Sequence, residues 1–124
     1  MAQSYRDLVA WQKALDLVAA VYEVSRAFPK EEVYGLTAQV RRAAVSVISN
    51  IAEGKGRWSK REFQHFLAQS RGSLLEVETQ ILVSQRLGYL SELETDRIVK
   101  MTEEVGRVLN GLMAAVKRNA QTES

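Results

Sequence analysis

Apolar residues recur every three or four positions through most of this chain, and that spacing constrains its fold more than any other feature. An α-helix turns once in 3.6 residues, so such spacing places the apolar side chains in one stripe along a helix. The longest stripe consists of Phe63, Leu67, Ser70, Leu74, Val77, Ile81 and Ser84. Seven glycines and one proline are too few for the many turns of a sandwich or barrel. The pattern therefore predicts an all-α protein.

Breaks in the pattern divide it into four predicted helices. Phe28-Pro29 ends the first helix, because a proline disfavours the helical conformation in the residue before it. Ser59 and Ser91 each precede a Glu by three residues, which is the capping box that begins a helix. The helices are expected at about residues 7–27, 36–53, 60–87 and 92–119. Short connections favour a single domain over residues 1–124, an antiparallel up-down-up-down four-helix bundle.

The stripes indicate which faces are buried. In the first helix the predicted core stripe is Leu8, Trp11, Leu15, Val18 and Tyr22, and in the last it is Ile98, Met101, Val105, Val108, Leu112 and Val116. The second helix carries two stripes. One is apolar and consists of Leu36, Val40, Ala44, Val47 and Ile51; the other is polar and consists of Gln39, Arg42, Ser46, Ser49 and Glu53. Two stripes exceed what one core needs, which favours a homo-oligomer.

Three local expectations follow from single residues. Gly54 should form a left-handed cap at the end of the second helix. Gly72, in the middle of the third helix, is expected to let a neighbouring helix approach closely. Glu103 and Arg107 are expected to form an ion pair one turn apart on the fourth helix.

Residue types needed for several kinds of chemistry are scarce. The chain has no Cys, which excludes disulfides, thiolate metal sites and Cys nucleophiles. Its one His, His65, follows Glu62 at the spacing used in di-iron bundles, but such a site needs two of these motifs, so His65 is interpreted as a surface residue. Glu53, Glu76 and Glu78 could meet across the second and third helices, and we interpret them as buried or interfacial carboxylates hydrogen-bonded to Arg, Ser or Gln. We therefore expect no enzyme activity, no metal and no cofactor.

Targeting signals are also lacking in the sequence. The N-terminal residues include no uncharged apolar stretch of signal-peptide length, and no segment approaches the roughly 20 apolar residues of a membrane span. The expected location is the cytoplasm, away from the membrane.

Positive charge gathers in the middle of the chain. The net charge is +2, but residues 41–71 contain seven Lys or Arg and two Glu, a balance of +5. The basic turn, defined as residues 55–61, contains Lys55, Arg57, Trp58, Lys60 and Arg61, and a weaker basic pair is Arg41 and Arg42. Cations contact phosphates and an aromatic ring stacks on unpaired bases, so the turn, together with the weaker pair Arg41 and Arg42, predicts RNA or DNA binding. The alternative is a solvated turn on a protein-interaction scaffold or a structural oligomer.

The stretch YGLTAQVRRAAVSVISNIAEGKGRWSKREFQHFLAQSRGSLLEVETQILVSQRLGYL resembles the four-helix-bundle family of ribosomal-RNA intervening-sequence proteins. The opening YRDLVAWQKAL and the turn FPKEEVYGL fit the same family, so the resemblance covers about residues 5–116. It implies a four-helix bundle, commonly a homopentamer, with no known enzyme activity. A more distant similarity, to the accessory protein of diversity-generating retroelements, implies nucleic-acid binding through a basic surface.

This chain departs from the family pattern at Ile48, where the family often has Pro. Ile supplies the backbone amide that Pro lacks, so the hydrogen bond to residue 44 can form. We expect the second helix to run straight through this position.

Overall fold

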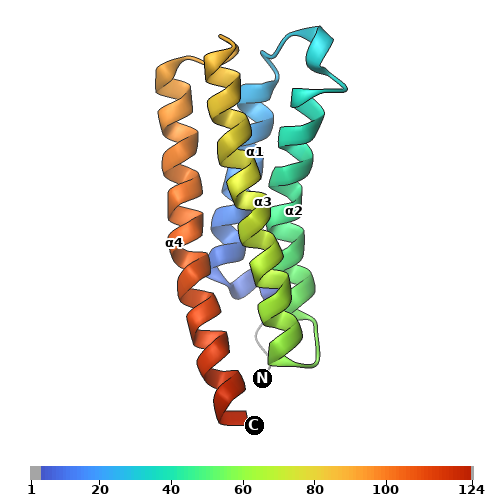
Figure 1. Ribbon diagram of the computed structural model, residues 1–124, viewed down its shortest axis with the longest axis vertical. Helices are drawn as coiled ribbons and strands as arrows, with labels where there is room; N and C mark the ends of the chain where they lie inside the picture. Colours follow the sequence, from blue (N-terminus) through green and yellow to red (C-terminus); the bar gives the residue numbers. More distant parts are fainter. Residues whose placement is uncertain (1–3, 124) are drawn as a thin grey trace.

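The computed structural model describes residues 4–123 and confirms an all-α four-helix bundle. Its elements are η1 (Tyr5–Asp7), α1 (Val9–Ser25), η2 (Lys30–Glu32), α2 (Leu36–Lys55), α3 (Lys60–Arg86) and α4 (Glu92–Glu123). The four α-helices lie side by side, and the described residues contain no strand (Figure 1). None of these helices is both long enough and apolar enough to cross a membrane. α2 continues unbroken through Ile48.

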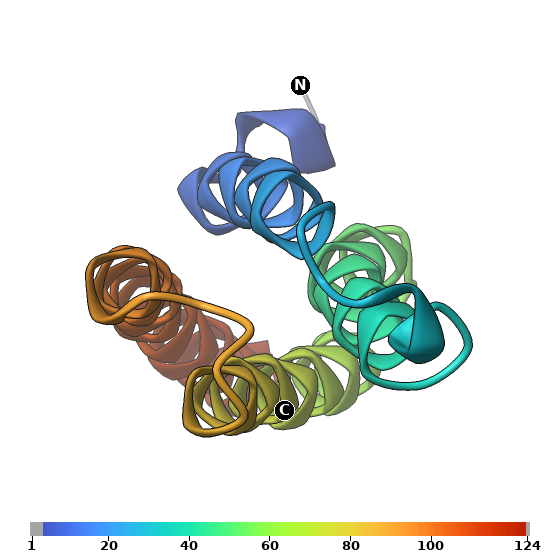
Figure 2. The same ribbon diagram turned by 90° about the horizontal axis from the view of Figure 1, so that it is seen from above.

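Each helix contacts the two helices next to it in a closed arrangement. α1 packs on α2, α2 on α3, α3 on α4 and α4 on α1, whereas the described backbones of diagonal helices stay more than 8 Å apart, Cα to Cα. Seen from above, α1 lies opposite α3 and α2 lies opposite α4 (Figure 2). The core fills the space between them, and its largest fully buried side chains include Leu17, Ile51, Leu67, Ile81, Ile98 and Leu109.

The first helix begins later than the sequence predicted. Ser4 caps η1, because its hydroxyl accepts from the amide of Arg6 and its own amide donates to Asp7 at 3.2 Å. Leu8 then adopts an extended conformation, and α1 starts at Val9 instead of Asp7. The capping box satisfies the early amides locally, so the chain can turn before it enters the long helix.

The predicted core stripe of α1 was partly wrong. The buried stripe consists of Ala10, Ala14, Leu17, Val21 and Val24, with 4-3-4-3 spacing. Leu15 and Tyr22 are exposed, and Trp11 and Val18 are half-buried at the edge of the core. Alanines let neighbouring backbones approach closely, so the face with the smaller residues turned inward. The stripe of larger residues lies beside it, partly in solvent.

Two glycines, Gly54 and Gly72, have structural roles different from those predicted. Gly54 forms no left-handed cap: it lies inside α2, where an added Cβ would lie 2.7 Å from the Cβ of Phe66. Its role is to let α2 and α3 approach each other closely. Gly72 was expected to allow a close approach by a neighbouring helix, but it is exposed, and an added Cβ would meet nothing within 4 Å. The one positive φ among the described residues is at Gly88, 83°, just after α3.

The predicted starts of the last two helices are confirmed. The Ser59 hydroxyl accepts from the amide of Glu62 at 3.0 Å, and the Ser91 hydroxyl accepts from the amide of Glu94 at 3.1 Å. Glu94 completes its box by accepting from the amide of Ser91 at 3.1 Å. These bonds satisfy amides that have no partner within a helix.

The inner face of α4 is rotated slightly from the predicted stripe. Thr102 and Leu109 are buried, whereas Met101, Val108 and Leu112 are only partly buried. The Thr102 hydroxyl donates to the carbonyl of Val99 at 2.8 Å, which explains how a polar side chain is accommodated there.

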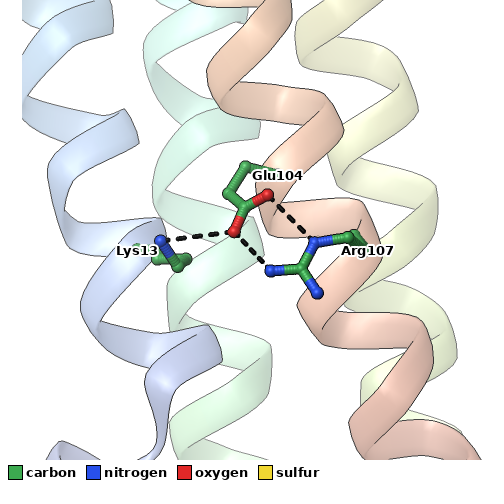
Figure 3. A network of polar contacts seen from close by, with 3 residues as sticks. All are labelled: Lys13, Glu104 and Arg107. Atoms are coloured by element: carbon green, nitrogen blue, oxygen red, sulfur yellow. Dashed lines mark hydrogen bonds and ion pairs between the residues drawn. The ribbon is translucent and has the colours of Figure 1, made fainter.

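The ion pair predicted on α4 involves a different acid. Arg107 binds Glu104, not Glu103, with its Nη2 2.6 Å and its Nε 3.0 Å from the carboxylate. Lys13 of α1 lies 3.4 Å from the same carboxylate, so Glu104 joins two helices (Figure 3). Glu104 faces α1 and therefore reaches a second cation, Lys13, whereas the exposed Glu103 forms no ion pair among the described residues.

Candidate nucleic-acid interface

The basic turn joins α2 to α3 at the end of the bundle where α1 begins and α4 ends (Figure 1). Two local contacts fix the position of the basic turn. Gly54 brings the last turn of α2 against Phe63 and Phe66 of α3, and Ser59 caps the first turn of α3. The turn is therefore fixed at both of its ends by α2–α3 packing.

Two cations of the turn lie over aromatic rings of α3. The Lys55 ammonium lies 5.9 Å from the centre of the Phe63 ring, and the Arg57 guanidinium lies 4.7 Å from the centre of the Phe66 ring. Arg57 also forms an ion pair with Glu53, with Nη2 2.9 Å from Oε1. Such contacts hold long cationic side chains in place and keep their charges at the bundle end.

The remaining members of the turn project into solvent. Trp58 is fully exposed and makes no ring contact or hydrogen bond with other described residues. Arg61 is exposed and Lys60 is half-buried, and neither forms an ion pair within the described part of the chain. Because the large apolar surface of Trp58 is not buried, it does not stabilise the folded subunit.

The net charge of the turn is smaller than its cations suggest. Glu53 lies against Arg57, and Glu62 lies in the first turn of α3 beside Ser59. Residues 53–62 contain four Lys or Arg and two Glu, a balance of +2. One copy of the turn therefore offers a modest field to a phosphate chain.

The structure separates the other predicted basic pair from this turn. Arg42 lies 13 residues before Lys55 on α2, roughly 20 Å along the helix at 1.5 Å per residue. Arg41 is engaged inside the bundle: its Nε donates to the Ser25 hydroxyl at 2.8 Å, and its guanidinium lies 4.6 Å from the centre of the Tyr22 ring. Arg41 thus ties α2 to the end of α1, while Arg42 is exposed.

A polar groove lies between α2 and α3, where the second stripe of α2 was predicted. Its volume is about 400 Å³, and it is lined by Gln39, Arg42, Ala43, Ser46, Ser73, Glu76 and Gln80. The hydroxyls of Ser46 and Ser73 are 2.8 Å apart and join the two helices. The Oε1 atom of Gln80 is buried and has no hydrogen-bond partner among the described residues. The sequence analysis did not predict the α3 side of this groove, although Ser73, Glu76 and Gln80 also recur at helical spacing.

The described residues include no group of three or more His, Asp or Glu placed to hold a metal ion. His65 is exposed, as expected, and shares a 3.0 Å hydrogen bond with Gln69. The Glu53 carboxylate accepts from Arg57, as expected, but it is exposed in this subunit, and Glu76, which lines the polar groove, is also exposed. The raised pKa of Tyr89 follows from its hydrogen bond to the Glu32 carboxylate, outside the basic turn and the polar groove.

Comparison with a solved structure supports the fold. A crystal structure titled as a protein with unknown function from the S23 ribosomal protein family of Bacteroides thetaiotaomicron superposes with a TM-score of 0.79. It is 18% identical in sequence, and the match covers 85% of this chain and 98% of that one. At this identity the likeness shows a shared bundle fold. No curated protein matches the chain.

The family comparison is more specific, because it matches the sequence itself. The family described as "23S rRNA-intervening sequence protein" matches residues 6–111, which is most of the chain and includes the basic turn and the polar groove. This chain belongs to the 23S rRNA-intervening sequence protein family.

Proposed function

We propose that this chain assembles into a homo-oligomer, a pentamer, and that the assembly binds RNA or DNA through its basic turns without catalysing a reaction. The observation that carries the proposal is the fully exposed Trp58 among the four cations of a turn that α2–α3 packing holds in place. A protein gains little from a solvated tryptophan in its free state, whereas such a ring can stack on an unpaired base.

Oligomerisation supplies the charge that one turn lacks. Residues 53–62 carry a net charge of +2 in one subunit, so five copies on one face would carry about +10, and several weak contacts on one strand would act together. A ring whose axis runs along the helices relates its subunits by rotation, so every basic turn falls on the same face. Two stripes on α2 and a second, half-exposed stripe on α1 support the assembly.

The proposed contacts define the kind of binding. Lys and Arg contacts to phosphates fix position but do not read base sequence, so we expect broad sequence tolerance. Stacking on Trp58 requires an unpaired base, so we expect single strands to bind more tightly than duplexes. Because cation contacts release counterions from the nucleic acid, affinity should fall steeply as salt rises.

The test is a titration of fluorescent single-stranded RNA with wild-type protein and two variants at two salt concentrations. The first variant replaces Lys55, Arg57, Lys60 and Arg61 with Ala. The matched control also removes four charges but replaces Arg26, Lys30, Lys100 and Lys117, which form no ion pair among the described residues. We expect the turn variant to lose affinity and to show a flatter salt dependence than the control. Equal binding by the two variants would contradict the proposal.

Trp58→Ala tests the stacking contact separately. Loss of one stacked base is worth ~1–3 kcal/mol, so affinity for a single strand should fall roughly 5- to 150-fold. Affinity for a duplex should change little, and Trp58→Phe should retain part of the preference. If wild-type protein binds no nucleic acid at low salt, the scaffold alternative is favoured.

A further inference from the structure

Two surfaces outside the basic turn have side chains that the subunit itself leaves uncovered. The first is the α1–α2 hollow, about 460 Å³ in volume and lined by Tyr22, Val33, Thr37, Ala38, Arg41, Arg42 and Val45. The second is the α3 ridge, defined as the exposed residues Leu75, Thr79, Leu82 and Val83. Leu75 is 59% exposed and Leu82 is 48% exposed, which is unusual for two leucines on one helix face.

We propose that the α3 ridge of one copy packs into the α1–α2 hollow of the next copy, so that the contact repeats head-to-tail and closes into a ring. The inference deepens the proposed oligomer, on which it rests, by assigning the two surfaces that meet. The partner in this contact is a second copy of this chain.

Spacing along the helices suits this pairing. Leu75 and Leu82 lie seven residues apart on the ridge, and Ala38 and Val45 lie seven residues apart on the wall of the hollow. Seven residues are nearly two helical turns, so each pair points in one direction and is separated by about 10.5 Å. Side chains with matching spacing can interdigitate when two helices pack nearly parallel or antiparallel.

Charge complementarity favours a contact between ridge and hollow over a contact between two hollows. The hollow is lined by Arg41 and Arg42 and by no acidic residue. Glu76 and Glu78 lie on opposite sides of the ridge, Glu76 toward the polar groove that Arg42 also lines, and neither carboxylate has an ion-pair partner among the described residues. Two hollows face to face would bring arginines together, whereas a ridge in a hollow brings Glu toward Arg. Arg71, which also bonds to Asn110, lies one turn before Leu75 and Arg86 lies one turn beyond Leu82, so the negative charge is confined to the middle of the ridge.

Gly72 supports an approach by another helix. It lies one turn before the ridge, is exposed, and has no neighbour within 4 Å of an added Cβ. Glycine is unfavourable in the middle of a helix, and here no contact within the subunit compensates for it. A glycine on the outer face does allow a second backbone to come near.

The directions of the two surfaces determine the type of assembly. The hollow opens between α1 and α2, whereas the ridge is on α3, the diagonal neighbour of α1 (Figure 2). Because they face in different directions, one flat two-fold contact cannot bury both. A contact between two different surfaces repeats from copy to copy, and it forms a closed ring when the rotation closes.

Cysteine crosslinking can test the pairing cleanly, because the chain has no native Cys. A double variant, Val45→Cys with Leu75→Cys, places one thiol at the hollow and one on the ridge. After treatment with a short bis-maleimide, denaturing electrophoresis should show a ladder of covalent species up to the number of subunits in the ring. Each single variant should remain a monomer on the same gel.

The matched control is Val45→Cys with Leu93→Cys, since Leu93 is an equally apolar, exposed residue of α4 that belongs to neither surface. It should give no ladder. A second pair, Tyr22→Cys with Leu82→Cys, repeats the test if the first variant fails to fold, as judged by its helical circular dichroism.

The outcomes separate this inference from the proposed function. A ladder that stops at two chains, or crosslinking of a single variant, would overturn the head-to-tail contact. Absence of crosslinks in both double variants, while light scattering shows that they are oligomeric, would overturn the assignment of surfaces but leave the oligomer standing. A monomeric wild-type protein would overturn both proposals.

Discussion

Glu104 is the residue at which charge most clearly contributes to the bundle. The hydrogen bond from Arg107 is the main reason that the pKa of Glu104 falls to about 2, from an ordinary value of 4.5; partial burial opposes the fall, and Lys13 adds to it. The same contact raises the pKa of Arg107. Lys13 belongs to α1, so the carboxylate links the first and last helices (Figure 3).

The lowered pKa predicts a specific pH dependence. Because the folded protein holds Glu104 ionised more strongly than the unfolded chain does, its contribution to stability is complete above about pH 4.5 and is lost as the pH falls through 2. The free energy of unfolding, measured by urea denaturation between pH 5 and pH 2, should therefore fall less steeply in Glu104→Gln than in wild type. Glu103→Gln is the control and should follow wild type. Identical slopes for the Glu104→Gln variant and wild type would contradict this role.

Gly54 provides a test of the close α2–α3 contact. Gly54→Ala would place a Cβ 2.7 Å from the Cβ of Phe66, so the two helices must separate. Overpacking of this kind costs typically 1–3 kcal/mol, which we expect as a loss in the free energy of unfolding. Gly111→Ala is the matched control, because its added Cβ meets nothing within 4 Å, and it should stabilise the helix by up to about 1 kcal/mol. A neutral Gly54→Ala variant would show that the contact is not tight.

At the level of helices, periodicity predicted how many there are and roughly where they lie, because the buried stripe must repeat with the helical turn. It did not select the correct stripe on α1. Ala10 and Ala14 contribute little to a hydrophobic pattern, yet they face the core, whereas Leu15 and Tyr22 do not. Which of two stripes turns inward depends on how closely the neighbouring helices pack, and a single helix does not contain that information.

The start of α2 depends on a contact that sequence spacing did not reveal. Glu32 of η2 accepts from the amide of Leu36 at 3.1 Å and from the hydroxyl of Tyr89 at 3.0 Å. It thus caps α2 and joins that end of the bundle to the α3–α4 turn. An added Cβ at Gly35 would lie 2.6 Å from the Glu32 carboxylate, so glycine leaves room for this contact.

We predict that Glu32→Ala destabilises the protein by roughly 0.5–2 kcal/mol, the range for loss of a helix cap. Chemical denaturation monitored by circular dichroism gives the value directly. Glu31→Ala removes the same charge from an exposed neighbour and should be nearly neutral. If the two variants lose equal stability, net charge and not the cap is responsible.

For the whole molecule, the sequence predicted the cluster of cations and Trp58 but not their partners. Arg57 lies in the turn just beyond the end of α2, so its ion pair with Glu53 depends on how the chain turns there and does not follow from helical spacing. The bonds of Arg41 to α1, and its distance from the basic turn, depend on how the helices are placed in the bundle. The polar groove was predicted only in part, for the same reason. The polar stripe of α2 could be read from the sequence, but Ser73 and Gln80, which line the other side of the groove, belong to α3.

The exposed surfaces and the basic turn lead to one description of the assembly. The ridge and the hollow are uncovered in one subunit, and the charge of one turn is small. A ring would cover the ridge and the hollow and would repeat the basic turn once per subunit. Both proposals therefore depend on whether the chain is an oligomer.

The mass of the wild-type particle, measured by light scattering during size-exclusion chromatography at micromolar concentration, tests this claim most directly. One chain has a mass of 13.9 kDa, so a pentamer should appear at about 70 kDa as a single species across the peak. A mass of 13.9 kDa would contradict the account, because the ridge and the hollow would then lack the partner that we propose for them.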